Sequence, residues 1–496
     1  MSRAKEERFA FGSVLEALSR GLYPDKRHVL REFVQNSYDS LSELRREVPK
    51  SLLSPIEIKI DAPSIFIGDK GLGMRAEQVK QYRYLGFSEK QPAMHAGFRG
   101  IGKYSAVAIA EKIIVDSSPL GEAKRYRAVI HADRMMDTLH KEKNPPLERI
   151  LRENTEFSET AGRRDDHFTF VELHKIRSDA AELMNMEKIR NYMMRIGPAP
   201  LDLTFPYAAK IEKELKENVP NYLSVEIKLN GQSLFKPFFE NCSEPEFETV
   251  LFDDKKPEVL AFCWYCQNQA KGQLDPKEDA GLIFRVKNIA VGDGQLSRRM
   301  LWKTTPERSF YFFGEIHVLD PEVVPSSDRT DFEDNSAREQ LISRCLRVST
   351  ILRKKAGEES ALRRFDETLE KGNQIIATRE DEINAGEVPV ELKDEVVFEI
   401  QKLQEDVRKR LGGPKTPQSA RRAQRLLGKT RRILRFVKGG QKGFVDLQAE
   451  LNFDPKLRTL YDTIMEVLRE EFRQQPDRLE RLVRRIHDAL RARLSA

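Results

Sequence analysis

Two glycine-rich segments constrain this chain more than any other feature, because each adjoins a stretch with a regular secondary-structure pattern. The first, IGDKGLGM at residues 67–74, follows a short strand-like pattern at 64–69. The second, GFRGIGKYSA at residues 97–106, leads into an apolar stretch that we expect to be a helix over 103–112. Glycines permit tight turns, and N–H groups at the start of a helix attract anions. Either segment alone is weak evidence for a ligand site.

Neither segment matches the phosphate loop or the dinucleotide fingerprint. Residues 97–106 do not read GxxxxGK[ST], and no strand feeds directly into a GxGxxG pattern there. Two side chains nevertheless suit a nucleotide. Asp69 can accept a hydrogen bond from an exocyclic amine, and Lys103 adds a positive charge beside the second turn.

A polar helix face precedes both turns. Residues 11–48 are predicted to be helical, and within LREFVQNSYDSL a spacing of 100° per residue brings Glu32, Asn36 and Asp39 into a narrow arc. Apolar side chains occupy roughly the opposite side: Leu30, Phe33, Val34 and Leu41. An ordinary solvated helix gives the same pattern, so the trio has meaning only together with the glycine turns.

The remaining patterns predict an α+β chain. Around these motifs, strands are expected at 56–60, 64–69, 112–118 and 167–176, which together with the helices suggest a two-layer α/β sandwich. A second mixed α/β region has strand patterns at 224–231, 259–266, 281–291 and 312–319. From residue 336 onward the pattern is helical, with plausible hinges at 411–420 and 436–444. We therefore divide the chain into domains at 1–200, 201–335 and 336–496.

The order and spacing of these segments resemble the GHKL (Bergerat-fold) ATPase superfamily. The matching stretches are LREFVQNSYDSL, IGDKGLGM and GFRGIGKYSAVAIAEKIIVDS, followed by HFTFVELH. Within the superfamily the chain resembles heat shock protein 90 most, and MORC and MutL more distantly. The resemblance covers about residues 10–200, and extends more loosely to about 340. It implies a GHKL sandwich that binds ATP with Mg²⁺ and hydrolyses it to ADP and phosphate.

The resemblance also implies roles for single residues. Glu32 would orient the attacking water as general base, and Asn36 would ligate the Mg²⁺ that bridges the phosphates, with Asp39 in the same cofactor-binding set. Asp69 would accept the adenine amino group, and Thr169 would support it through water. The adenine floor would comprise Gly71, Gly73 and Met74. The phosphates would rest on Gly97, Gly100, Ile101, Gly102 and Lys103. Residues 75–96 would form a mobile lid, although a static surface loop is the alternative.

A cation from the second region would complete the site. The stretch GEIHVLDPEVVPSSDR at 314–329 is similar to the heat shock protein 90 segment that bears a catalytic arginine, which implies that Arg329 reaches the γ-phosphate. An arginine supplies a planar, permanently charged fork for this task. The alternative is a salt bridge from Arg329 to a neighbouring acid. Lys287 is a weaker candidate, more simply explained as a solvated residue of one long strand over 281–291.

The charge distribution leaves the partner open. Residues 407–445 contain no acid but thirteen bases, a field that attracts phosphates: Arg408, Lys409, Arg410, Lys415, Arg421, Arg422, Arg425, Lys429, Arg431, Arg432, Arg435, Lys438 and Lys442. Basic helices are also often plain solvated faces. Three functions remain open: a chaperone-like clamp acting on protein clients, a nucleic-acid-associated ATPase, and a nucleotide sensor or effector subunit that hydrolyses ATP slowly or not at all. A bacterial stress or defence module would suit either of the last two. The absence of a phospho-acceptor histidine helix argues against a histidine kinase.

The other expectations concern location, metals and assembly. No apolar run reaches the roughly 18 residues of a membrane span, and the first residues lack a secretory signal, so we expect a cytoplasmic protein without a membrane partner. Cys263 and Cys266 form a lone CxxC, for which free thiols are favoured over a zinc site. A homodimer is expected, because closure in this superfamily works in pairs. An apolar stripe could serve as its seam, dock a partner or simply pack: Leu479, Leu482, Ile486 and Leu490.

Overall fold

A computed structural model describes residues 25–48, 53–84, 95–96, 102–143, 145–253, 256–270, 272–440 and 443–494. The chain divides into two compact units, Met1–Arg353 and Lys354–Ala496. The first mixes helices and strands, and the second is helical, in agreement with the predicted classes. The finer division into domains at 1–200, 201–335 and 336–496 stays a prediction. Among the described helices, none combines the length and apolar character needed to cross a bilayer.

The first unit contains an eight-stranded sheet in the order β5-β4-β3-β6-β2-β1-β7-β8. Its strands confirm the expected ones and add others: β1 (Ile56–Asp61), β2 (Ser64–Asp69), β3 (Ala110–Ser118), β4 (Lys124–His131), β5 (Thr155–Ala161), β6 (Phe168–Ile176), β7 (Ile227–Leu229) and β8 (Gln232–Leu234). Neighbouring strands are antiparallel except β1 and β7, which are parallel. Two strands from the predicted middle region, β7 and β8, thus extend the N-terminal sheet.

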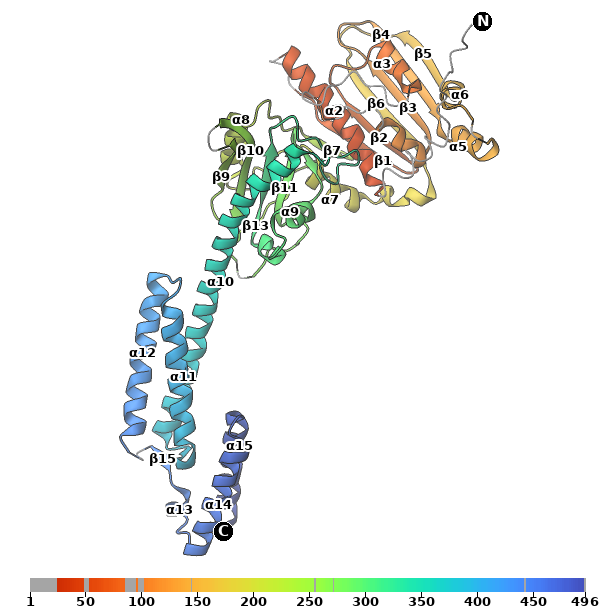
Figure 1. The fold of residues 1–496 in the computed structure, drawn as a ribbon. Helices are drawn as coiled ribbons and strands as arrows, with labels where there is room; N and C mark the ends of the chain where they lie inside the picture. The colour runs from red at the N-terminus through yellow and green to blue at the C-terminus, as the bar shows by residue number, and fades with distance from the viewer. Residues whose placement is uncertain are drawn as a thin grey trace, which may run out of the picture. The chain divides into compact units, whose positions relative to one another are not determined.

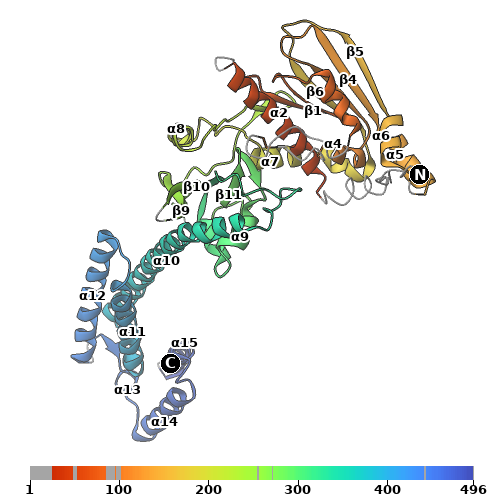
Figure 2. The ribbon, with the colours of Figure 1, turned by 45° about the horizontal axis from the view of Figure 1, so that its top comes forward.

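Helix α2 (Arg27–Glu47) lies against one face of this sheet, as Figures 1 and 2 both show. Its apolar stripe enters the core, where Leu30, Val34 and Leu41 are fully buried beside strand residues such as Ile58 and Ile67. Burial of this stripe fixes which face of the helix stays accessible. Of the predicted helix over 11–48, residues 11–24 lie outside the described residues. The sheet is further accompanied by α3 (Ala76–Lys80), α5 (Ala132–Lys141), α6 (Leu147–Glu153) and α7 (Met186–Ile196).

The predicted helix over 103–112 is wrong in its second half. Helix α4 (Gly102–Ser105) continues as a 3-10 helix (Ala106–Ala108), and β3 begins at Ala110. Strand β3 pairs on both sides, with β4 and with β6. Two full ladders of hydrogen bonds outweigh the high helix propensity of Ala110, Glu111 and Lys112.

A second sheet in the same unit has the order β12-β11-β13-β10-β9. Its strands are β9 (Glu246–Asp253), β10 (Lys256–Gln267), β11 (Gly281–Val286), β12 (Ile289–Val291) and β13 (Phe312–Val318), accompanied by α8 (Ala208–Asn218) and α9 (Gly294–Leu301). The single strand predicted over 281–291 is wrong, because Lys287 and Asn288 both have positive φ, 53° and 58°. Two such residues make the tight turn that joins a hairpin.

A buried ionic cluster joins the second sheet to elements next to the first. Glu315 of β13 contacts Arg285 and accepts a hydrogen bond of 3.1 Å from Lys236, which follows β8. Arg285 in turn donates to the carbonyls of Arg195 and Gly197, at the end of α7. Burial alone would raise the pKa of Glu315, but Arg285 and Lys236 lower it well below its ordinary value. An ionised carboxylate between two cations therefore fixes this joint.

The second unit packs its helices around a core of its own. It contains α10 (Ser336–Ala385) from Lys354 onward, then α11 (Lys393–Leu411), α12 (Pro417–Lys438), α13 (Leu447–Glu450), α14 (Pro455–Glu471) and α15 (Pro476–Leu494), with two-residue strands β14 (Val388–Pro389) and β15 (Phe444–Val445). The predicted hinge segments 411–420 and 436–444 each contain a helix end, but both also overlap α12, at 417–420 and 436–438. Helix α12 starts where Thr416 accepts a hydrogen bond from the Ser419 N–H, with Pro417 at the first position.

The apolar stripe of α15 serves mainly as internal packing. Leu479 is 3% exposed, and Ile486 and Leu490 pack against the core of the second unit. Leu482 is half-buried. Of the three interpretations left open by the sequence, simple packing accounts for most of this stripe.

Candidate functional site

The polar face of α2 is the first wall of the candidate site. Glu32 and Asn36 are half-buried, whereas Asp39 is 2% exposed. Asp39 Oδ1 accepts a hydrogen bond of 2.7 Å from the N–H of Ala96, the last described residue before the second glycine-rich segment. The helix therefore fixes the backbone of Ala96.

The turn after β2 is the second wall. Asp69, 3% exposed at the end of β2, accepts a hydrogen bond of 2.9 Å from the Gly71 N–H, which closes the turn. The Leu72 N–H donates to Ser40 Oγ at 3.0 Å. A Cβ at Gly71 would lie 2.1 Å from that same oxygen. Since Ser40 follows Asn36 by one helical turn, the Asp69 turn lies directly against the polar face of α2.

The far end of the turn is fixed by β3 and β6. Gly73 has a φ of +70°, and a Cβ there would meet the Ser118 carbonyl oxygen at 1.9 Å. The Met74 N–H donates to Ser117 Oγ at 2.8 Å, and Thr169 Oγ1 lies 3.0 Å from the same oxygen. Thr169 is also the register partner of Asp69 across β2 and β6. Asp69, Met74 and Thr169 therefore share one small region.

Parts of the predicted site fall on undescribed residues. Gly97, Gly100 and Ile101 lie outside the described residues, as does the side chain of Lys103, while Gly102 is the first residue of α4. Of the predicted lid, residues 85–94 are also outside. Its earlier part is not a loose loop, because Val79 and Tyr82 are buried and the Tyr104 hydroxyl donates to the Tyr82 carbonyl at 2.6 Å.

Arg329 lies in the segment that follows β13, and it contacts Ala96. It is 4% exposed, and its Nη2 donates to the Ala96 carbonyl oxygen at 2.6 Å. The backbone around it is anchored twice: Gly292 N–H donates to the Arg329 carbonyl at 2.7 Å, and Arg31 of α2 donates to the Asp328 carbonyl. Ala96 thus contacts Asp39 through its N–H and Arg329 through its carbonyl.

Lys287 is not the solvated strand residue that the sequence predicted. It occupies the β11–β12 turn and is half-buried. Burial lowers its pKa to about 8; Asp39 opposes this shift, whereas Arg329 and Arg46 contribute to it. Its amine therefore lies within electrostatic reach of both α2 and the arginine.

Sequence reasoning missed the residues that support the turn. These are Ser40 and Ser117, described above, and His167, whose Nδ1 lies 2.6 Å from the Gly71 carbonyl oxygen. The spacing of Ser40 from Asn36 could have indicated the first, but nothing in the sequence distinguishes the other two. Within the described part of the chain, no group of three His, Cys, Asp or Glu side chains could hold a metal ion, and the four cysteines are buried free thiols.

Comparison with known proteins gives local similarity to one group of chaperones. The chain is 30% identical to the chaperone protein HtpG of Chromobacterium violaceum over 142 residues, 24% of this chain and 22% of that protein. It is 28% identical to heat shock protein 90-5, chloroplastic, of Arabidopsis thaliana over 208 residues, 37% and 25% of the two chains. It is 26% identical to the chaperone protein HtpG of Alcanivorax borkumensis over 223 residues, which are 40% of this chain and 32% of that protein.

The chain thus spans about a quarter to a third of the length of these relatives. No family model matches it. The similarity supports a relation to heat shock protein 90 over part of the chain.

Proposed function

We propose that this chain is an ATP-driven conformational clamp, similar to heat shock protein 90, that binds and hydrolyses Mg²⁺-ATP and acts on protein clients. One observation carries the proposal: the Asp69 turn and Ala96 are both hydrogen-bonded to the polar face of α2, through Ser40 and Asp39. Segments far apart in sequence thus converge on the face of α2 that also bears Glu32 and Asn36. The local similarity to HtpG and heat shock protein 90 supports the same function.

In this proposal the nucleotide lies along α2. Asp69 accepts a hydrogen bond from the adenine amino group, and Thr169 supports this contact through water. Asn36 ligates the Mg²⁺, and Glu32 orients the attacking water. Gly71, Gly73 and Met74 shape the adenine floor, and residues 97–103 hold the phosphates. Such a site works by positioning and charge neutralisation, which phosphoryl transfer mainly requires. A cytoplasmic location and a homodimer belong to the same proposal.

Steady-state ATP hydrolysis, measured with Mg²⁺ and with excess chelator, tests the proposed activity. Mg²⁺-dependent release of phosphate is the expected result. ATP binding without turnover would favour the sensor alternative, and no ATP binding at all would exclude the proposal.

Arg329→Ala should lower the turnover of ATP by about a hundredfold while ATP binding changes little, as expected when one group that stabilises transition-state charge is removed. The reason is that Arg329 would stabilise charge on the γ-phosphate in the transition state, from its position beside Ala96. Arg329→Lys should restore only part of the rate, because an ammonium lacks the planar fork. The control is Arg299→Ala, which removes an exposed arginine from α9. Equal turnover in all three variants would remove Arg329 from the mechanism.

A nucleic-acid-associated function is the second candidate, supported by the surface of α12. Its apolar face is buried in the second unit, with Ala423, Leu426 and Ile433 between 0% and 4% exposed. The opposite face exposes a row of bases: Arg421, Arg425, Lys429, Arg431, Arg432, Arg435 and Lys438. Ion pairs to α10 engage Arg422 and Arg432, at 3.4 and 2.9 Å. Lys442, in the same basic stretch, lies outside the described residues.

If this surface binds nucleic acid through about six phosphates, the affinity for a DNA duplex should fall about a thousandfold between 50 and 200 mM salt. Arg425→Gln combined with Lys429→Gln should reduce the slope of log K against log salt by about two. The matched control, Lys213→Gln with Lys216→Gln on α8, should leave the slope unchanged. Fluorescence anisotropy with labelled duplex measures both, and no binding at low salt would leave the chaperone-like function ahead.

A further inference from the structure

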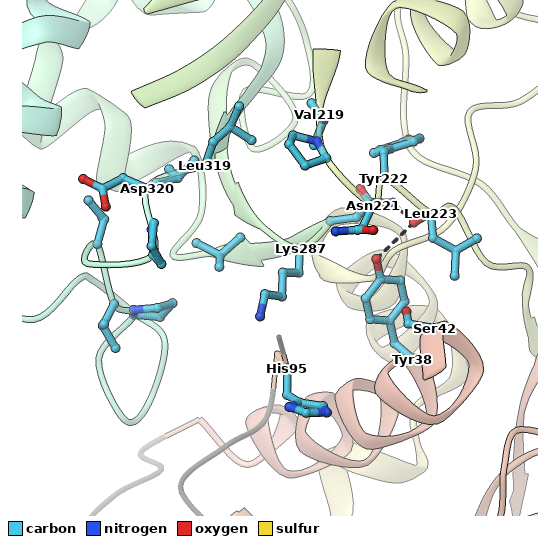
Figure 3. Close-up of a pocket in the computed structure, with 18 of the residues that line it drawn as sticks. Tyr38, Ser42, His95, Val219, Asn221, Tyr222, Leu223, Lys287, Leu319 and Asp320 are labelled. Atoms are coloured by element: carbon cyan, nitrogen blue, oxygen red, sulfur yellow. Dashed lines mark hydrogen bonds between the residues drawn. The ribbon is translucent and has the colours of Figure 1, made fainter. Parts of the chain in front are cut away.

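A cavity of about 340 Å³ lies next to the proposed nucleotide site. Its described walls come from the C-terminal half of α2, the segments 219–223 and 318–325, and the β11–β12 turn, with His95 and Arg329 (Figure 3). Among these described walls neither Asp69 nor the turn after it occurs. The volume falls within the roughly 300–1,000 Å³ of small-molecule sites. The cavity is therefore large enough for a ligand distinct from the nucleotide.

The walls combine an apolar surface with positive charge. One part is built from aliphatic side chains: Val219, Leu223, Val286, Val318, Leu319 and Val324. Four cationic side chains also line the space: Arg45, Arg46, Lys287 and Arg329. Asp320 is the one acid among the described walls, so the lining carries a net positive charge. An apolar wall next to several cations suits a ligand with an apolar body and an anionic group.

Lys287 is positioned to contact that anionic group. Figure 3 shows its side chain extending into the space bounded by Tyr38, His95 and the Leu319–Asp320 segment. Asn288 holds the turn that carries Lys287. Its side-chain oxygen accepts a hydrogen bond of 2.8 Å from Lys236 Nζ, and its side-chain NH₂ donates one of 2.8 Å to the Leu223 carbonyl. The buried ionic cluster around Glu315 thus fixes the backbone at Lys287. A cation that is already held in position binds an anion at lower entropic cost.

The pKa of Lys287 agrees with this position. Burial lowers the pKa of Lys287 to about 8. The positive charges of Arg329 and Arg46 contribute to this decrease, whereas the negative charge of Asp39 opposes it. A bound anion would offset the cost of holding the half-buried Lys287 close to the buried Arg329.

We propose that this cavity binds a small organic anion, in which a carboxylate, sulfonate or phosphate ester on an apolar ring or chain contacts Lys287 and Arg46 while the apolar body lies against the valine-rich wall. Arg329 lines the cavity and also contacts Ala96. A bound anion would therefore affect the position of Arg329 beside the ATP site. This effect rests on the proposed function, whereas the binding of the anion does not.

The probe for this site is 8-anilinonaphthalene-1-sulfonate, measured by fluorescence titration of the full chain without nucleotide. Its uncharged analogue, N-phenyl-1-naphthylamine, has the same rings without the sulfonate. We expect saturable binding of one sulfonate probe per chain, at least about tenfold tighter than the analogue, because a charge-assisted hydrogen bond is lost with the sulfonate. Lys287→Met should abolish that difference, and Lys287→Arg should retain most of it.

Lys303→Met, at an exposed lysine outside the cavity, is the matched control and should bind both probes like wild type. Thermal melting of each variant establishes that folding is intact. Equal affinity for the two probes in wild type, or an unchanged preference in Lys287→Met, would overturn the inference. Lys287-dependent binding in a chain that never hydrolyses ATP would refute the proposed function alone, and ATP hydrolysis without such binding would refute this inference alone.

Discussion

Glu32→Ala protein will bind ATP with nearly the affinity of wild type but will hydrolyse it at least about a hundredfold more slowly. A positioned general base contributes roughly 10²–10⁴ in rate, and its removal leaves the binding contacts in place. Glu32 lies on the α2 face that also bears Asn36 and Asp39, half-buried one turn before Asn36. No backbone change is expected, because alanine is the strongest helix former.

Phosphate release under saturating ATP measures the rate, and isothermal titration measures binding. Glu47→Ala provides a matched control, because it removes an exposed carboxylate from the last turn of the same helix. It should hydrolyse ATP at the wild-type rate. Wild-type turnover in Glu32→Ala would show that the attacking water is activated elsewhere.

Asp69→Asn protein will lose ATP binding by about a hundredfold with little loss of stability. The buried carboxylate accepts one hydrogen bond from the Gly71 N–H at 2.9 Å, and we propose that it also accepts one from the adenine amino group. An asparagine can keep the first bond through its oxygen. Its NH₂ group then faces the adenine NH₂ group, so that two hydrogen-bond donors oppose each other in a buried site. The binding free energy falls because one hydrogen bond is lost and both donors are left without an acceptor.

Isothermal titration with ATP and with GTP measures this effect, together with the melting temperature. The control is Asp61→Asn, which changes an exposed aspartate at the end of the neighbouring strand β1. It should bind ATP like wild type. Unchanged ATP affinity in a folded Asp69→Asn protein would contradict the assignment of Asp69 to the base.

The sequence predicted the elements whose patterns are local. The apolar stripe of α2 and the alternation in β6 follow directly from burial of one face, and the structure confirms them. The short strands expected at 56–60 and 64–69 are also present, as β1 and β2. The closing of the Asp69 turn by Gly71 was likewise readable, because an aspartate followed two residues later by glycine favours such a turn. The convergence of the turn with α2 was inferred from a resemblance and from no pattern in the residues.

What escaped prediction depends on contacts between distant segments. The chain switches from helix to strand at Ala110 because β3 pairs on both sides. β7 joins the first sheet by parallel pairing with β1. Ser117 and His167 support the turn from strands or loops far along the chain. None of these contacts leaves a periodic pattern in the sequence. Secondary-structure propensity alone therefore misplaces the boundary between helix and strand, or gives no indication of the contact.

The most direct test is a crystal structure of the chain with Mg²⁺ and a non-hydrolysable ATP analogue. The account predicts the adenine amino group within hydrogen-bond distance of the Asp69 carboxylate, the Mg²⁺ on Asn36, and the γ-phosphate between α2 and Arg329. An analogue bound at another place, with positions 32, 36 and 69 facing away from it, would contradict the account.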